Sequence, residues 1–170
     1  MAEPVTLYKL IVLYMLSKAD FPLTDSQLSD FILGQGYTDY IILHQVFSDL
    51  EESDMIRSEI ILNNRYYSMT DAGAEALKFF HNRISPAIRS DIDQYMVENK
   101  MKLRDEVSVL ADYYKNTDGD YSVHCYVKEK LSRPIDMTFS VPYEEQAKKA
   151  CRNWQEHSQR IYEFIIKELL

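Results

Sequence analysis

The chain has 170 residues, of which 46% are hydrophobic, so it can form one good-sized domain or two small ones. Its net charge of -8 at pH 7 argues against a protein that coats nucleic acid non-specifically, because such binding requires cations that neutralise phosphates. No apolar run has transmembrane length, and Cys125 and Cys151 lack metal-ligand spacing, so we expect a cytoplasmic protein with reduced thiols and no membrane partner.

The first half of the chain predicts three helices separated by short breaks. Apolar residues on most sides of segment 7–16 indicate a helix at the centre of its domain. A second helix is expected to begin at Thr24 or Asp25 and to end at the glycine-containing segment 34–36. A third begins at Thr38, and its apolar residues recur at the i, i+3, i+4, i+7 spacing of an inward face. These residues are Leu43, Val46, Phe47 and Leu50.

A β-hairpin and a fourth helix are predicted next. Residues 56–62 alternate between two faces, and residues 65–69 form a second short segment. The Asn-Asn pair between them suits a tight turn, because asparagine tolerates positive φ. Thr70 or Asp71 is expected to cap the helix that follows.

The rest of the chain predicts a small antiparallel sheet between two helices. A helical pattern follows Pro86, and three alternating segments after Leu103 indicate a meander with one face that needs cover. The long terminal helix, which opens at Pro142, repeats apolar residues in steps of four and three. It can cover the sheet, pair with a second copy of itself, or do both. We therefore predict an α+β protein with an N-terminal domain at 1–84 and an α-βββ-α region at 85–170.

The return strand of the hairpin carries a recognisable motif, Tyr67-x-Met69-Thr70-x-x-Gly73-x-x-x-Leu77. With the three preceding helices, it resembles the winged helix-turn-helix regulators of the multiple-antibiotic-resistance and phenolic-acid-repressor type. The resemblance covers roughly residues 5–80, and the whole architecture looks like an uncharacterised bacterial winged-helix family. It implies a transcriptional regulator that binds double-stranded DNA. It also implies a homodimer, because palindromic operators match twofold symmetry.

By analogy with such regulators, the third helix enters the major groove and the hairpin wing lies along the DNA backbone. Gln45 is suited to adenine, and Ile41 is suited to a thymine methyl group. The DNA-binding residues implied by the resemblance are Thr38, Ile41, His44, Gln45, Ser48, Arg57, Asn63, Asn64 and Arg65. The compact cluster of Lys100, Lys102 and Arg104 is a possible auxiliary basic patch.

The distribution of charge favours a second hypothesis. Between Leu23 and Ile56 there is no Lys or Arg, whereas seven residues are acidic. A DNA reader usually obtains half or more of its hydrogen bonds from phosphates, largely through Arg and Lys. The alternative is therefore a winged-helix protein-protein interaction module that does not bind DNA and that exposes Tyr37, Tyr40 and Ile41 to a protein partner.

No catalytic or metal-binding motif is present in the sequence. The four histidines are scattered over different predicted elements, and His124 and Cys125 are adjacent on a strand, so they point to opposite faces. We therefore expect no enzymatic activity, no catalytic residues, no metal site and no cofactor.

Overall fold

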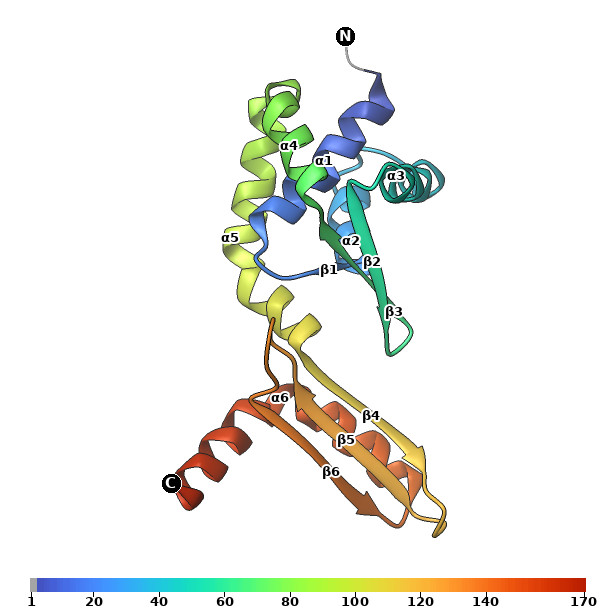
Figure 1. Ribbon diagram of the computed structural model, residues 1–170, viewed down its shortest axis with the longest axis vertical. Coiled ribbons are helices and arrows are strands. Elements are labelled where there is room, and N and C mark those ends of the chain that lie inside the picture. The colour runs from blue at the N-terminus through green and yellow to red at the C-terminus, as the bar shows by residue number, and fades with distance from the viewer. Residues whose placement is uncertain (1–2) are drawn as a thin grey trace. The chain divides into compact units, whose positions relative to one another are not determined.

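The computed structural model describes residues 3–170 (Figure 1). The chain is an α+β protein that divides into two compact units, Met1–Leu103 and Arg104–Leu170. The domain boundary predicted from the sequence lies earlier, after residue 84. The difference arises because Ile92, Met96 and Leu103 are buried in the core of the first unit.

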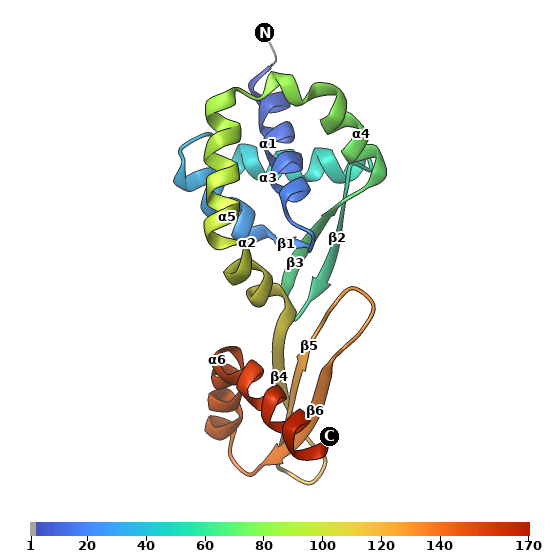
Figure 2. The same ribbon diagram turned by 90° about the vertical axis from the view of Figure 1, so that its left-hand side faces the viewer.

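The first unit consists of helices around a small antiparallel sheet. Its elements are α1 (Pro4–Lys18), β1 (Leu23–Thr24), α2 (Asp25–Gly34), α3 (Tyr40–Glu52), β2 (Ile56–Ile61), β3 (Asn64–Met69), α4 (Asp71–Phe80), the 3-10 helix η1 (His81–Arg83) and most of α5 (Pro86–Ser108). The strand order is β1-β3-β2, and Figure 2 shows β2 and β3 as a long hairpin. Strand β1 was not predicted, because two residues are too few to show a periodic pattern.

Side-chain caps define where α2 and α3 begin. Thr24 caps α2 in a capping box with Gln27, and the Asp39 carboxylate accepts a hydrogen bond from the backbone N–H of Ile42 at the start of α3. Helix α3 therefore begins one residue after Asp39 rather than at Thr38. Its predicted inward face is confirmed, since four residues of α3 are buried in the core: Leu43, Val46, Phe47 and Leu50.

The hairpin is joined to α4 by a tightly packed junction that explains the sequence motif. The Thr70 hydroxyl accepts a hydrogen bond from the Gly73 N–H at 3.1 Å and donates one to the carbonyl oxygen of Asp54 at 2.6 Å. The Thr70 N–H donates to the carbonyl oxygen of Met55 at 3.1 Å. A Cβ at position 73 would lie 2.2 Å from that same oxygen. Glycine is therefore required by close backbone approach, and Leu77 anchors the next turn in the core.

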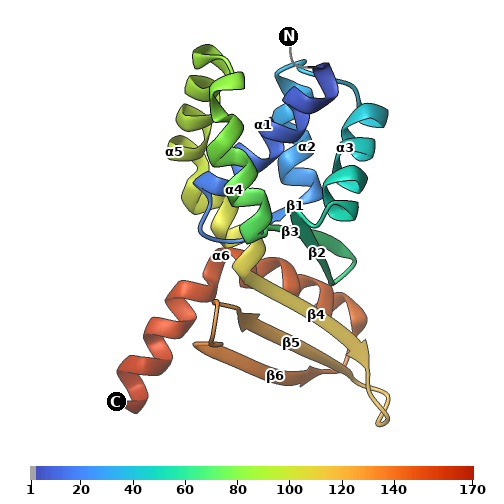
Figure 3. The ribbon, with the colours of Figure 1, turned by 45° about the horizontal axis from the view of Figure 1, so that its top comes forward.

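The second unit is a three-stranded antiparallel sheet with one face covered by a helix (Figure 3). Its elements are β4 (Val109–Lys115), β5 (Tyr121–Val127), β6 (Ile135–Val141) and α6 (Glu144–Leu169), in the strand order β4-β5-β6. The predicted meander is confirmed, although its first strand begins at Val109 because α5 continues to Ser108. Trp154 of α6 is buried, and its indole N–H donates to the carbonyl oxygen of Tyr126 at 3.2 Å.

We expect Gly73→Ala to lower the free energy of unfolding by about 1–3 kcal/mol or more, because the new Cβ overlaps the Met55 carbonyl oxygen. Urea unfolding followed by circular dichroism measures the change. Gly34→Ala is the matched control, since nothing lies within 4 Å of its new Cβ. Equal stability of the two variants would contradict the proposed packing of the junction.

We expect Trp154→Phe to lower the free energy of unfolding by about 1–3 kcal/mol, because it removes a buried hydrogen bond to the Tyr126 carbonyl oxygen and part of a buried ring. Tyr114→Phe is a suitable control, because Tyr114 is exposed. Far-ultraviolet circular dichroism is the appropriate probe, since Trp154 is the lone tryptophan. An unchanged unfolding midpoint for Trp154→Phe would argue against a structural role for this hydrogen bond.

Candidate interaction surface

The outward side of α3 presents one continuous ridge to solvent. Ile41, Gln45, Ser48 and Glu52 follow the i, i+4, i+7, i+11 spacing of a single helical face, and all four are exposed. Ile41 is 80% exposed and the neighbouring Tyr40 is 62% exposed. The ridge is therefore apolar at its N-terminal end, polar in the middle and acidic at Glu52.

The polar middle of the ridge is bonded within the protein. The Gln45 side-chain amide donates to Asp49 Oδ1 at 2.8 Å, and Lys9 Nζ lies 3.1 Å from Asp49 Oδ2. The hydrogen bond from Gln45, together with that from Lys9, lowers the pKa of the Asp49 carboxyl. The Ser48 hydroxyl donates to the carbonyl oxygen of His44 at 3.2 Å. A base contact by Gln45 would have to replace its bond to Asp49.

Two of the residues predicted to contact DNA lie off the ridge. Thr38 is half-buried, and its hydroxyl has no hydrogen-bond partner among residues 3–170. His44 is also half-buried, with its ring centroid 4.1 Å from that of Tyr40 and 5.5 Å from that of Phe47. Its Nε2 lies 3.7 Å from Asp25 Oδ1. His44 therefore packs against the exposed Tyr40 ring and does not belong to the exposed ridge.

The two arginines of the hairpin are on opposite faces. Arg57 lies opposite Ser68 in the β2-β3 register, whereas Arg65 lies opposite Ile60, and adjacent pairs alternate between faces. Arg65 donates to Ser58 Oγ at 2.8 Å and lies 3.8 Å from Glu51. Arg57 Nε lies 3.5 Å from Asp54. Both arginines therefore have a carboxylate partner, and they do not form one basic surface.

The tip of the hairpin carries two asparagines, and an exposed isoleucine lies near it. The tight turn lies one residue earlier than the predicted Asn63-Asn64 pair: Leu62 and Asn63 have positive φ angles of 50° and 64°, whereas Asn64 already pairs with Ile61 in the strand register. Asn63 and Asn64 are both exposed. Ile60 is 64% exposed although it lies on the same face as the buried Ile56 and Tyr67, so the core covers this face only near the start of β2. This exposure was not predicted, because the alternating pattern does not show how far along the hairpin the cover extends.

The auxiliary basic residues lie on the second half of α5. Lys100, Lys102 and Arg104 are exposed, and Lys100 Nζ lies 3.6 Å from Asp20 Oδ1. The boundary between the two compact units falls between Leu103 and Arg104. The cluster is therefore divided between two units rather than belonging to one.

Tyr37 does not belong to the exposed surface on which the protein-binding hypothesis placed it. Its ring packs against the core of the first unit, and its hydroxyl donates to Asp91 Oδ2 at 3.0 Å. Burial, together with this hydrogen bond, raises the pKa of Tyr37 to about 12. Tyr40 and Ile41 are exposed as predicted, and the adjacent Ile42 is partly exposed.

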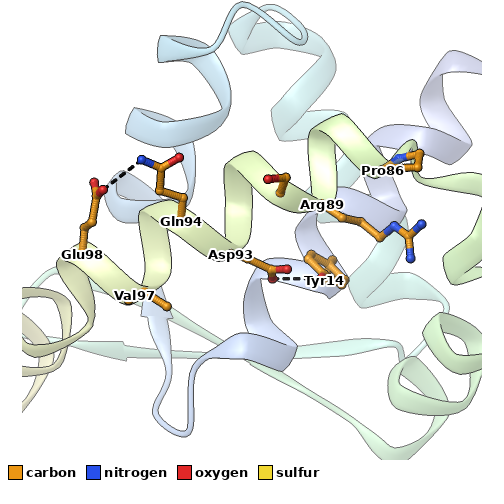
Figure 4. Close-up of a pocket in the computed structure, with 8 residues that line it drawn as sticks. Tyr14, Pro86, Arg89, Asp93, Gln94, Val97 and Glu98 are labelled. Carbon is orange, nitrogen blue, oxygen red and sulfur yellow. Dashed lines mark hydrogen bonds between the residues drawn. The ribbon is translucent and has the colours of Figure 1, made fainter.

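A shallow groove of about 540 Å³ lies elsewhere on the first unit, along α5 (Figure 4). The Tyr14 hydroxyl donates to Asp93 Oδ1 at 2.9 Å, and Gln94 donates to Glu98 at 3.0 Å. Arg89 lines the same groove, and its buried Nε has no hydrogen-bond partner in the described part of the chain. Charges of both signs line the groove, so it selects no single class of ligand.

Within 3–170, no group of three or more His, Cys, Asp or Glu side chains could hold a metal ion. Burial raises the pKa of the Cys125 thiol to about 11, so it is a poor nucleophile near neutral pH. In this part of the chain, no helix has the length and apolar character needed to cross a membrane.

Comparison with known proteins identifies a family. A family described as a domain of unknown function, DUF4364, matches residues 8–169, which is nearly the whole chain. No curated protein and no solved structure matches the chain. The extent of the family match shows that the chain belongs to the DUF4364 family.

Proposed function

We propose that the N-terminal part of this protein is a winged helix-turn-helix module that binds a protein partner through α3. The succession α1, β1, α2, α3, β2, β3 and the β1-β3-β2 sheet support this fold, because a winged helix consists of three helices followed by a hairpin wing. The Thr70–Gly73 junction between the hairpin and α4 supports it as well.

The observation that carries the proposal is the exposed apolar end of α3. Tyr40 and Ile41 are adjacent and largely exposed, and Ile42 adds further apolar area. Aromatic side chains are enriched in protein interfaces, where they provide much of the binding energy. The His44 ring packs against the Tyr40 ring in a tilted arrangement, with the centroids 4.1 Å apart, and this contact restricts the positions open to the exposed ring.

The charges around α3 support a protein rather than DNA as the partner. Helix α3 has no Lys or Arg, and Glu51 and Glu52 lie near its negative C-terminal end. Lys9, Arg57 and Arg65 each face a carboxylate of the same unit. Phosphates would have to compete with these carboxylates for the cations and would also be repelled by them.

A second candidate function is binding of duplex DNA as a transcriptional regulator. The observation that favours it is the exposed polar hairpin tip at Asn63 and Asn64, which provides hydrogen-bond donors where a wing would meet the DNA backbone.

We expect a photo-crosslinking residue at position 41 to yield a discrete protein adduct in cells that naturally express the chain. The same residue at position 79 is the matched control, because Phe79 is a similarly exposed apolar side chain on α4. Tyr40→Ala should weaken the interaction by about tenfold or more, as expected for an aromatic residue at the centre of an interface. Identical adduct patterns from positions 41 and 79, or no adduct from either, would contradict the proposal.

We expect no retardation of pooled genomic duplex fragments in gel shifts at about 50 mM salt, a concentration at which phosphate contacts are strong. Retardation that weakens with added salt and is lost in an Arg65→Ala, Gln45→Ala double variant would instead establish the DNA-binding function. Lys149→Ala is a control for general loss of positive charge, because Lys149 is exposed on α6.

A further inference from the structure

Strand β6 is an edge strand that lacks the features which usually prevent pairing with another chain. It lies at one end of the β4-β5-β6 order, so its outer backbone groups face no strand within residues 3–170. The segment Ile135–Val141 contains no Lys, Arg or Pro, the residues that commonly protect such edges. Its one charged side chain, Asp136, is bonded to His124 and Arg133 of the same unit.

The face of β6 that belongs to the core is incompletely covered by α6. Val123 and Cys125 of the central strand are buried on this face. Phe139 lies opposite Val123 in the register and belongs to the same face, yet it is 39% exposed. The apolar layer of the sheet therefore extends beyond the area that α6 of the same chain shields.

The last turns of α6 also carry an exposed apolar face, because the helix continues past the sheet that covers its earlier turns. The face of α6 that packs on the sheet continues from Trp154 through Ile161 and Ile165 to Leu169. Along it the exposure rises from 2% at Trp154 to 76% at Leu169. Figures 1 and 3 both show the last turns of α6 extending past the strands on the side of β6.

We propose that the chain forms a twofold-symmetric dimer in which β6 pairs antiparallel with β6 of a second copy. The last turns of each α6 then cover the exposed inner face of the other copy's β6. Antiparallel pairing of two identical strands places the twofold axis perpendicular to the sheet, so both α6 helices lie on the same face. Each copy supplies the cover that the inner face of the other copy's β6 lacks.

The exposed apolar side chains provide about half of the surface that such a dimer needs. Phe139, Tyr162, Ile166 and Leu169 together expose roughly 400 Å², taking about 200 Å² for each fully exposed large side chain. A specific interface needs about 800 Å² per partner, and the seven-residue strand edge contributes further area and new backbone hydrogen bonds. A second copy is the occupant that supplies both a matching strand edge and a matching apolar helix end.

Light scattering coupled to size-exclusion chromatography of the full chain tests this dimer. We expect a mass twice the 20.0 kDa of one chain. Phe139→Glu and Leu169→Glu should each raise the dissociation constant by about tenfold or more, because each buries an unpaired charge at the interface. Leu131→Glu is the control and should leave the dimer intact, since Leu131 is fully exposed in the loop before β6.

Two outcomes would overturn the proposal. One is a wild-type chain that keeps the mass of a single copy at the highest concentration reached. The other is a dimer that Leu169→Glu leaves unchanged. Leu169→Glu is decisive even if Phe139→Glu impairs folding, because Leu169 is exposed within one chain and the substitution does not disturb the unit's core. The result is independent of the α3 surface, since no residue of α3 takes part.

Discussion

The first unit depends on the contact between the Met55 carbonyl oxygen and the start of α4. That oxygen accepts the Thr70 N–H and lies where a side chain at position 73 would begin. Thr70 also binds the Asp54 carbonyl oxygen, so the segment after α3, the end of β3 and the first turn of α4 are joined at one point. This junction fixes how the hairpin leaves α3. The exposed side of α3 is consequently presented by a rigid frame.

The chemistry of that exposed side follows from which charges are already paired. Lys9 is held by Asp49, and Arg65 is held by Glu51, so the cations closest to α3 are used within the unit. Surface ion pairs of this kind add little stability, but they reduce the positive charge available to phosphate. The apolar pair Tyr40 and Ile41 has no comparable internal use. These facts together favour protein recognition over DNA recognition.

Local patterns in the sequence predicted most of the elements, and contacts between distant residues account for what they missed. The inward face of α3, the Thr24 and Thr70 caps and the covering stripe of α6 are short-range features with a fixed period. The predicted boundary after residue 84 differs from the division into compact units after Leu103, because burial of Ile92 and Met96 depends on packing against the rest of the first unit. The Arg65–Glu51 pair and the bond from Tyr37 to Asp91 likewise join separate elements, so spacing along the chain could not reveal them.

The central claim is that α3 recognises protein and not DNA. Hydrogen-exchange mass spectrometry tests it most directly, comparing the chain isolated with its natural partners, the chain alone and the chain mixed with duplex DNA. The account predicts slower exchange of the backbone amides of residues 40–48 in the sample isolated with its partners, and unchanged exchange of these amides in the sample mixed with DNA. Protection of α3 and of the hairpin tip at 62–65 by DNA, with no change in the partner sample, would contradict it.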